Sequence, residues 1–440
     1  MENKTEQRIG VIGLGYVGLT LALCLAECGF RVSGFDKSKK VIKIIKKGEM
    51  PFYEAGLKHL LKKYLGQRFI VTDNFTGKNV CDTYIIAVGS PLNKKNKPDL
   101  HDLKDVAEDL GIILKRGDSV ILRSTVPIGA TRNFIIPILE EKSGLKAGDD
   151  FFVSFAPERT VSGCALEELR TLPQVIGEID KKNAGSAARI FSSMTDTIVM
   201  VDSLEEAEIV KLINNTYRDV TFGFANEVAL IAQRWGMDGK KVIEAANHGY
   251  RRGGIPLPSP GVGGYCLTKD PFIFIESAKS KGYDPLLFKH ARNTSDKMID
   301  FISEHTLSFL KNYKNHKRDP KILILGVAFK GNPATSDVRW STSISLIKNL
   351  QNASYNNIFA FDPVVRRDDI LIHNIKHVVD IKKGFVDTDV ILVGNNHSYF
   401  KEMEIKKMLS LTSKPVLLFD SWGLFDKELS ELKDVYYKRL

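Results

Sequence analysis

The chain has 440 residues, a formal net charge of +10 and 43% hydrophobic residues, an ordinary globular composition. A chain of this length is too long to fold around a single hydrophobic core, so two or three domains are expected. The lysines are scattered without a basic stripe interleaved with aromatics, which argues against nucleic acid as a partner. A phosphorylated small-molecule substrate accounts for the positive charge equally well.

Membrane and metal partners are not expected either. No apolar run reaches the length of a membrane span, and the first eight residues are polar, so the expected location is the cytoplasm. The five cysteines include no C-x-x-C pair and no metal-ligand spacing, so no metal site is predicted. Cys24 and Cys28 lie four apart on an apolar helical face and are predicted core residues. Reduced thiols fit a cytosolic protein.

The N-terminal segment predicts a dinucleotide-binding motif. A buried strand is expected over residues 8–12, a helix over 19–28 and a second strand over 31–36, with G-x-G-x-x-G before the helix. The glycines permit a tight turn and close approach to a pyrophosphate, which the helix N-terminus stabilises. Asp36 is predicted to bond the ribose hydroxyls and to favour NAD over NADP. The predicted cofactor loop comprises Gly13, Gly15, Tyr16, Val17 and Gly18.

The alternation of strands and helices then continues. Strands are expected over residues 83–88, 119–124 and 151–155, and a helix over 99–114. Such alternation predicts a doubly wound parallel sheet, in which ligands bind at the carboxyl ends of the strands. Three polar residues follow these strand ends and predict a cleft, although each could alone be a helix cap or a turn residue. They are Ser90, Thr125 and Glu158.

From Ser203 the pattern becomes helical. One long helix without proline is predicted over residues 204–235, and it is expected to join the domains and to form a dimer surface. Lys211 and Asn215 lie one turn apart on this helix and share a face, with Arg218 near it. The ordinary interpretation of a helical lysine is a solvated surface residue. Further helical segments follow over residues 242–246, 270–281 and 284–310.

The stretch over residues 258–270 is the most informative of the chain. Its glycines let the backbone bend tightly and approach a ligand closely. Cys266 follows them at once, and Lys269 and Asp270 come next. A cation near a thiol favours the nucleophilic thiolate. The alternative is a surface loop in which Cys266 packs as a small hydrophobic residue.

A second, smaller α/β domain is predicted after a charged linker over residues 314–320. Its first strand is followed by a glycine-containing loop that lacks Walker spacing, yet Lys330 and backbone amides there could hold a phosphate. Asp362, after the second strand, could meet a ribose or merely begin a turn. Strands are expected over residues 321–325, 358–361, 390–393 and 416–419. The predicted domains are a NAD-binding domain (1–200), a central helical domain (201–313) and a C-terminal nucleotide-sugar-binding domain (314–440).

Together these motifs resemble those of the UDP-glucose/GDP-mannose dehydrogenase family, the nucleotide-sugar 6-dehydrogenases. The resemblance covers nearly the whole length in the family's order and spacing, which is far more specific than any one motif. It implies two Rossmann-like domains joined by a central helical domain with a long helix. It rests on GLGYVG (13–18), STVPIG (124–129), APER (156–159), EIVKLINNTY (208–217), FANE (224–227), PGVGGYCLTKD (260–270), GVAFKGN (326–332), SDVR (336–339) and FDP (361–363).

The resemblance also implies the site residues. Cys266 matches the nucleophile and Lys211 its partner, and the other catalytic positions are Asp270, Glu158, Thr125 and Asn215. The positions by the cofactor are Lys269 and Arg339, with Thr125 and with Ser90, which replaces the family's usual threonine. The substrate positions are Arg159, Thr160, Lys211, Asn215, Arg218, Tyr250, Arg251, Gly263, Phe329 and Lys330. Thr268 is a second departure, because the glucose enzymes usually have proline there.

The implied reaction is a four-electron oxidation of a sugar CH2OH group to a carboxylate with two NAD, through a thiohemiacetal and a thioester on Cys266. Arg159 stands where the glucose enzymes usually carry phenylalanine, and the resulting pattern resembles the UDP-N-acetylhexosamine enzymes. UDP-N-acetylmannosamine is therefore favoured and UDP-N-acetylglucosamine is next, with UDP-glucose as the alternative. The products would enter surface polysaccharides or glycan chains, and a homodimer is expected.

Two other classes remain as alternatives. A two-electron dehydrogenase of the 3-hydroxyacid type has the same order of domains, but it needs neither Cys266 nor a second nucleotide-binding domain. A catalytically inactive NAD-sensing or scaffold protein is expected to lose the set formed by Lys211, Cys266 and Glu158, and all three are present.

Overall fold

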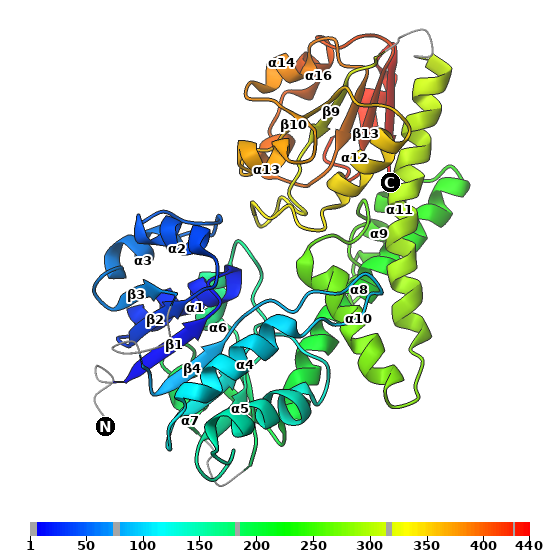
Figure 1. Ribbon diagram of the computed structural model, residues 1–440. Coiled ribbons are helices and arrows are strands. Elements are labelled where there is room, and N and C mark those ends of the chain that lie inside the picture. The colour runs from blue at the N-terminus through cyan, green and yellow to red at the C-terminus, as the bar shows by residue number, and fades with distance from the viewer. Residues whose placement is uncertain (1–6, 74–79, 181–184, 314–318, 426) are drawn as a thin grey trace. The chain divides into compact units, whose positions relative to one another are not determined.

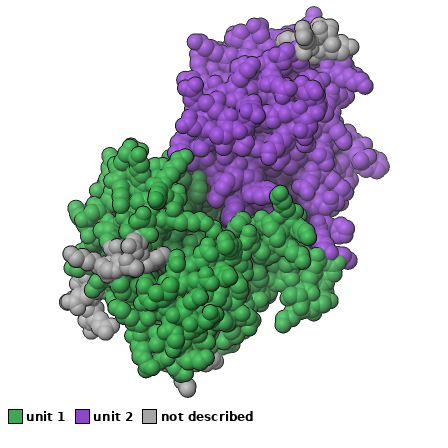
Figure 2. All heavy atoms as spheres, viewed as in Figure 1, with its two compact units in different colours: residues 1–215, 269–284 green, residues 216–268, 285–440 purple. Residues whose placement is uncertain are grey.

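The computed structural model describes residues 7–73, 80–180, 185–313, 319–425 and 427–440 (Figure 1). The chain divides into two compact units (Figure 2): the first comprises residues 1–215 and 269–284, and the second residues 216–268 and 285–440. Most of the charged linker expected over residues 314–320 lies outside the described residues. The three domain ranges 1–200, 201–313 and 314–440 stay a prediction.

The first unit is built on an eight-stranded sheet of order β3-β2-β1-β4-β5-β6-β7-β8. Neighbouring strands are parallel, as predicted for a doubly wound sheet, except for the antiparallel pair β6 and β7. The central strands are buried on both faces, as their continuous apolar sequences require. The strands are β1 (Arg8–Ile12), β2 (Arg31–Phe35), β3 (Phe69–Thr72), β4 (Thr83–Ile86), β5 (Ser119–Leu122), β6 (Phe152–Phe155), β7 (Gln174–Glu178) and β8 (Ile198–Val201).

Helices cover both faces of this sheet, as a doubly wound fold requires. One hydrophobic core contains side chains of α1, α3 and α7, and another contains side chains of α4 and α5. Cys24 on α1 is buried as predicted, whereas Cys28 is only half-buried and its thiol donates to the Ser193 carbonyl. The helices are α1 (Tyr16–Glu27), α2 (Lys39–Lys46), α3 (Leu57–Tyr64), α4 (His101–Ile113), α5 (Ile136–Ser143), preceded by a π-helical turn (Thr131–Ile135), α6 (Ala165–Thr171) and α7 (Ser186–Phe191).

Four helices follow the first sheet: α8 (Leu204–Arg234), α9 (Gly239–Asn247), α10 (Tyr265–Lys279) and α11 (Leu286–Tyr313). The long helix expected over residues 204–235 is confirmed by α8. Among the described residues, none of the helices is both long and apolar enough to cross a membrane.

The loop predicted around Cys266 is wrong in its second half, because α10 begins at Tyr265 and contains the thiol. Pro271 lies inside this helix, and proline signals a helix break because it lacks an N–H group. The Leu267 carbonyl, four residues earlier, instead accepts from the Arg292 guanidinium at 3.4 Å. The helix therefore continues through the proline, with Arg292 replacing the missing donor.

The second unit holds a six-stranded, all-parallel sheet of order β11-β10-β9-β12-β13-β14, which confirms the second α/β fold. Side chains of α11, α12 and α13 pack in one core cluster with the sheet, and those of α14 and α16 pack in another. The strands are β9 (Ile322–Leu325), β10 (Ile358–Phe361), β11 (Lys376–His377), β12 (Val390–Val393), β13 (Val416–Asp420) and β14 (Val435–Arg439). The helices are α12 (Thr342–Asn352), α13 (Arg367–Leu371), α14 (Ile381–Phe385), α15 (Ser398–Lys401) and α16 (Ile405–Leu409), with a 3-10 turn at Lys427–Glu431.

Candidate active site

The glycine loop after β1 has the shape that a pyrophosphate needs. Gly13 has a φ of +92°, which favours glycine, and its N–H donates to the Phe35 carbonyl at 2.8 Å. A Cβ on Gly18 would lie 1.8 Å from the Gly13 carbonyl oxygen, so a larger residue would push α1 off the loop. A Cβ on Gly15 would meet nothing within 4 Å, which leaves that side open at the N-terminus of α1.

Asp36 completes this cradle at the end of β2. One of its carboxylate oxygens accepts from the Leu14 N–H at 2.8 Å, and the other accepts from the Ser38 N–H at 2.8 Å. The half-buried carboxylate is thus fixed against the glycine loop and keeps lone pairs for two ribose hydroxyls. Loop, helix N-terminus and acid together fit a dinucleotide without a 2′-phosphate.

Five predicted site residues meet in one buried polar network of the first unit. Asp270 is fully buried and pairs with the Lys269 ammonium at 2.6 Å, while the Asn215 amide donates to its other oxygen at 2.5 Å. The Lys269 ammonium also lies 3.4 Å from the Ser90 hydroxyl, which donates to the Thr125 carbonyl at 2.5 Å. The turns after β4 and β5 are therefore linked to α8 and α10.

Lys211, one helical turn before Asn215 on α8, is only 6% exposed. The ordinary interpretation of a solvated helical lysine is therefore wrong at this position. A buried lysine is uncommon unless it has a partner or a function, so its burial supports a role in a site.

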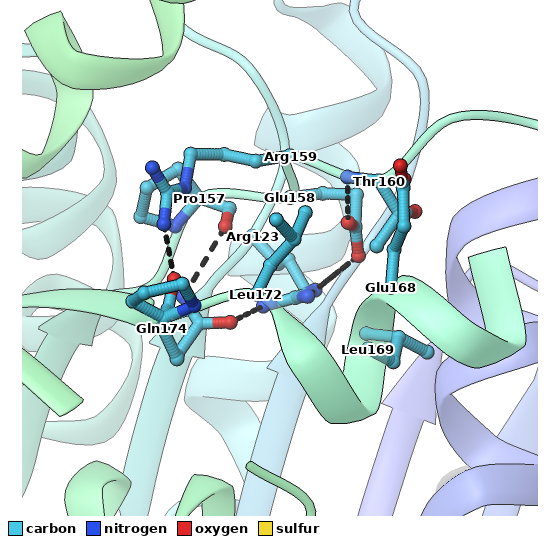
Figure 3. Close-up of a pocket in the computed structure, with 10 residues that line it drawn as sticks. Arg123, Pro157, Glu158, Arg159, Thr160, Glu168, Leu169, Leu172 and Gln174 are labelled. Carbon is cyan, nitrogen blue, oxygen red and sulfur yellow. Dashed lines mark hydrogen bonds and ion pairs between the residues drawn. The ribbon is translucent and has the colours of Figure 1, made fainter. Parts of the chain in front are cut away.

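Glu158 follows β6 and is 7% exposed. The Arg123 guanidinium donates to its Oε2 from Nη2 at 2.5 Å and from Nε at 3.0 Å, and the Thr160 N–H donates to Oε1 at 2.7 Å (Figure 3). Burial alone would raise the pKa of Glu158, but Arg123, the Thr160 N–H and Lys211 outweigh it and lower the pKa. Sequence reasoning missed Arg123, although a charged residue directly after a buried apolar strand is a signal for a buried ion pair.

Arg159 lies in the same small pocket, with its guanidinium donating to the Pro173 carbonyl (Figure 3). Burial lowers the pKa of Arg159, although Glu158 opposes this. Glu168, which lines the same pocket, accepts from the Val161 N–H at 2.5 Å. The substrate role of Arg159 stays a prediction.

In the second unit, Cys266 is exposed in the first turn of α10. Close packing surrounds the glycines that precede it, since a Cβ on Gly264 would lie 2.6 Å from the Phe329 ring. The Arg339 guanidinium stacks over the Tyr265 ring at 4.6 Å and pairs with Asp337 at 2.7 Å. The structure therefore brings the thiol's turn, Phe329 and Arg339 together.

Other predicted residues are not brought to a site by these contacts. Arg218, Tyr250 and Arg251 are exposed, and their substrate roles stay predictions. Lys211 belongs to the first unit and Cys266 to the second, so their predicted partnership also stays a prediction.

The sequence matches three models of the UDP-glucose/GDP-mannose dehydrogenase family: its NAD binding domain at residues 7–195, its central domain at 205–297 and its UDP binding domain at 323–427. The UDP-N-acetyl-D-mannosamine dehydrogenase of Pyrococcus horikoshii is 33% identical over 90% of this chain and 91% of its own length. The UDP-N-acetyl-D-glucosamine 6-dehydrogenase of Pseudomonas aeruginosa is 31% identical over 97% of this chain and 99% of its own. A solved structure of the UDP-D-ManNAc dehydrogenase from Pyrococcus horikoshii superimposes with a TM-score of 0.87 at 30% identity, covering 98% of this chain and 99% of that one.

Proposed function

Since the chain belongs to the UDP-glucose/GDP-mannose dehydrogenase family and is an NAD-dependent nucleotide-sugar 6-dehydrogenase, we propose that it oxidises C6 of a UDP-N-acetylhexosamine. UDP-N-acetylmannosamine is the favoured substrate and UDP-N-acetylglucosamine the next. Similarity over nearly the full length to dehydrogenases of both sugars supports this choice. The uronic acid product would enter polysaccharide or glycan synthesis in the cytoplasm.

One observation carries the catalytic proposal: the buried network of Asp270, Lys269 and Asn215, which lies on α8 and α10. The same helix α10 carries Cys266 one turn before Asp270, and α8 carries the buried Lys211. This combination supplies a thiol nucleophile, a base and oxyanion donors, which a four-electron oxidation requires and a simple alcohol dehydrogenase does not.

The first oxidation converts the C6 hydroxyl to an aldehyde. Lys211, together with Asp270 and a water, assists removal of the hydroxyl proton. NAD would be held by the glycine loop and Asp36 and would supply the hydride acceptor for both oxidations, and Lys269 and Arg339 are the further cofactor residues that we propose. The side chains of the proposed site have to orient C6 of the sugar and to exclude bulk water.

The second oxidation proceeds on Cys266. Its thiolate forms a C–S bond with the aldehyde carbon, and the oxyanion takes a proton to give a thiohemiacetal, which is then oxidised to a thioester. Lys211 and Asn215 stabilise the oxyanions, and each such donor contributes about 3 kcal/mol in a preorganised site. Water, positioned by Thr125 and deprotonated by Glu158, then attacks the thioester. The C–O bond forms, the C–S bond breaks and the thiolate returns.

The substrate is tested by measuring NADH formation with UDP-N-acetylmannosamine, UDP-N-acetylglucosamine, UDP-N-acetylgalactosamine, UDP-glucose and GDP-mannose. We expect two NADH per uronate and the highest kcat/KM with an acetamido sugar. Equal efficiency with UDP-glucose would overturn the substrate class alone. One NADH per aldehyde released would indicate a two-electron dehydrogenase, and NAD binding without any NADH would indicate a sensor or scaffold.

A homodimer across α8 is the accompanying proposal. Tyr217, Phe224 and Ile231 recur every seven residues, so they share one helix face, and they are 69%, 55% and 54% exposed. Trp235, directly after the helix, is 78% exposed. We expect light scattering to give twice the chain mass and Phe224→Glu to give a monomer, whereas the control Ile372→Glu, at another exposed apolar position, leaves the mass unchanged. A monomeric wild type contradicts the proposal.

A further inference from the structure

Arg123 is a buried arginine directly after β5, and only 2% of it is exposed. Its Nε and Nη2 donate to Glu158, and its Nη1 donates to the Ala156 carbonyl and to the Gln174 side chain, both at 3.0 Å. The Phe191 ring lies beneath the guanidinium at 5.0 Å. Burying this charge costs free energy. The paired carboxylate and the other hydrogen-bond acceptors offset that cost, and together they fix the orientation of the guanidinium.

The Glu158 carboxylate accepts three hydrogen bonds, two from Arg123 and one from Thr160 (Figure 3). Arg123 grips Oε2 with two donors, and the Thr160 N–H reaches Oε1, so the carboxylate cannot rotate without losing charge-assisted hydrogen bonds. Gln174 supports the arrangement, because its amide also donates to the Pro157 carbonyl at 3.2 Å. Oε1 retains a lone pair, which is what a base needs.

We propose that Arg123 is a positioning residue for the hydrolysis step, holding the Glu158 carboxylate in place to take a proton from water. This inference rests on the proposed function. In the step, the water oxygen bonds to the thioester carbon and its proton passes to Glu158. The C–S bond breaks with its electron pair going to Cys266, so no oxidant or reductant is consumed.

The electrostatics agree with this role. Burial would by itself raise the pKa of Glu158, and Arg123 is the largest of the influences that lower it. Removing Arg123 leaves Lys211 and Arg159 as the nearby cations. Cys24 is neutral, because burial raises the pKa of its thiol to about 12. Five titratable groups lie around Glu158. They are Arg123 directly after β5, Lys211 on α8, Arg159 in the turn after β6, Cys24 on α1 and Glu168 on α6.

The sign of the pH effect follows. With Arg123 present, Glu158 stays a carboxylate down to acidic pH and can accept a proton. Without Arg123 its pKa rises, so the carboxyl group carries a proton over a wider acidic range and loses its function as a base. The acidic limb of the pH profile for uronate release should therefore move to higher pH.

The test compares Arg123→Met and Arg123→Lys with the control Arg132→Met, using the better UDP-N-acetylhexosamine as substrate. Arg132 pairs with the partly exposed Glu205 at 2.7 Å, so its loss should have little effect. For Arg123→Met we expect uronate release near pH 6 to fall by about 100-fold, the typical contribution of a general base. The acidic limb should move up, and intact-protein mass spectrometry after a quench should detect a thioester on Cys266. Arg123→Lys should retain the positive charge but lose the pair of donors on Oε2, so the rate of uronate release should lie between those of wild type and Arg123→Met.

An unchanged acidic limb and no thioester in Arg123→Met would overturn the inference. If Arg123→Met does not fold, Arg123→Lys decides, and a wild-type rate of uronate release near pH 6 together with a wild-type pH profile in that variant overturns the inference. In a Glu158→Gln background the Arg123→Lys change should have no further effect on release, and a full additional loss would mean that Arg123 does not act through Glu158. A wild type that makes no uronate refutes the proposed function itself, whereas an active wild type with unaffected variants refutes this inference alone.

Discussion

The loops after β1 and β9, one in each unit, begin in the same way and end differently. Gly13 and Gly326 have φ values of +92° and +94°. The N–H of each glycine donates at 2.8 Å to the carbonyl of the last residue of the neighbouring strand, which is Phe35 for Gly13 and Phe361 for Gly326. An aspartate follows that strand in both units. The sequence therefore places the same strand, turn and acid at the start of two α/β folds.

The two aspartates differ in what remains for a ligand. Asp36 accepts one N–H on each oxygen and is half-buried. Asp362 is 6% exposed and accepts the N–H groups of Val327, Ala328, Val364 and Val365 as well as the Asn395 amide. Asp362 thus holds its own turn, and the alternative that it meets a ribose is not favoured.

The connection to the next helix differs as well. Helix α1 begins at Tyr16, almost directly after its glycine, whereas α12 begins only at Thr342. The long connection in the second unit carries Phe329, Lys330 and Arg339. A shared first turn therefore does not determine the ligand. The two connections differ in what they present, because the short one leads directly to a helix N-terminus and the long one carries side chains.

The largest expected effect concerns Cys266, and it tests whether the second unit supplies the catalytic nucleophile in addition to binding a nucleotide. Cys266→Ser should lower uronate release by about 10⁴-fold or more, as loss of a catalytic nucleophile does. The fold should persist because Cys266 is exposed. The measurement is uronate release by chromatography together with thermal unfolding. A serine variant that releases uronate at the wild-type rate contradicts the nucleophile.

The second prediction concerns the short loop of the first unit. Gly18→Ala should lower NAD affinity by about 100-fold, a loss of about 2.7 kcal/mol, because its Cβ meets a backbone carbonyl that cannot move away. Gly15→Ala should weaken NAD binding without lowering the melting temperature, since its Cβ meets no protein atom within 4 Å. Calorimetric titration with NAD measures the affinity of both variants, and thermal unfolding measures their melting temperatures. Unchanged affinity in Gly18→Ala would count against the cradle.

The third prediction separates the two aspartates by stability. Asp362→Asn should lower the free energy of unfolding by about 2 kcal/mol, because buried N–H donors lose a charged acceptor and face an amide. Asp36→Asn should cost less, since fewer donors depend on it. Urea denaturation of the two variants measures the difference. If both lose the same stability, Asp36 is as structural as Asp362 and the comparison fails.

Most of the sheet framework could be predicted from the sequence, because buried apolar runs and glycine turns are local signals. The strands β1, β10 and β12 have the predicted bounds. Helix α10 was misjudged at its start because Pro271 conceals a helix that Arg292 supports from elsewhere in the chain. The pair of Arg123 and Glu158 was missed because its residues follow two neighbouring strands. A charge after an apolar strand indicates a buried ion pair, but it does not identify the partner. The resemblance identified the site residues but not which of them bond to one another.

The smallest expected effect is a change of cofactor preference at Asp36. The carboxylate is fixed against the glycine loop by the N–H groups of Leu14 and Ser38, so it cannot turn away from a 2′-phosphate. NAD should therefore be preferred in the wild type, and Asp36→Asn should raise the ratio of kcat/KM for NADP to that for NAD by about tenfold, or about 1.4 kcal/mol. Asparagine keeps the size of the side chain and removes the repulsion. The matched change Asp362→Asn, in the second unit, should leave the ratio unchanged even where it lowers stability. If the wild type uses NAD and NADP with equal kcat/KM, an aspartate directly after the second strand does not predict contact with a ribose in either unit.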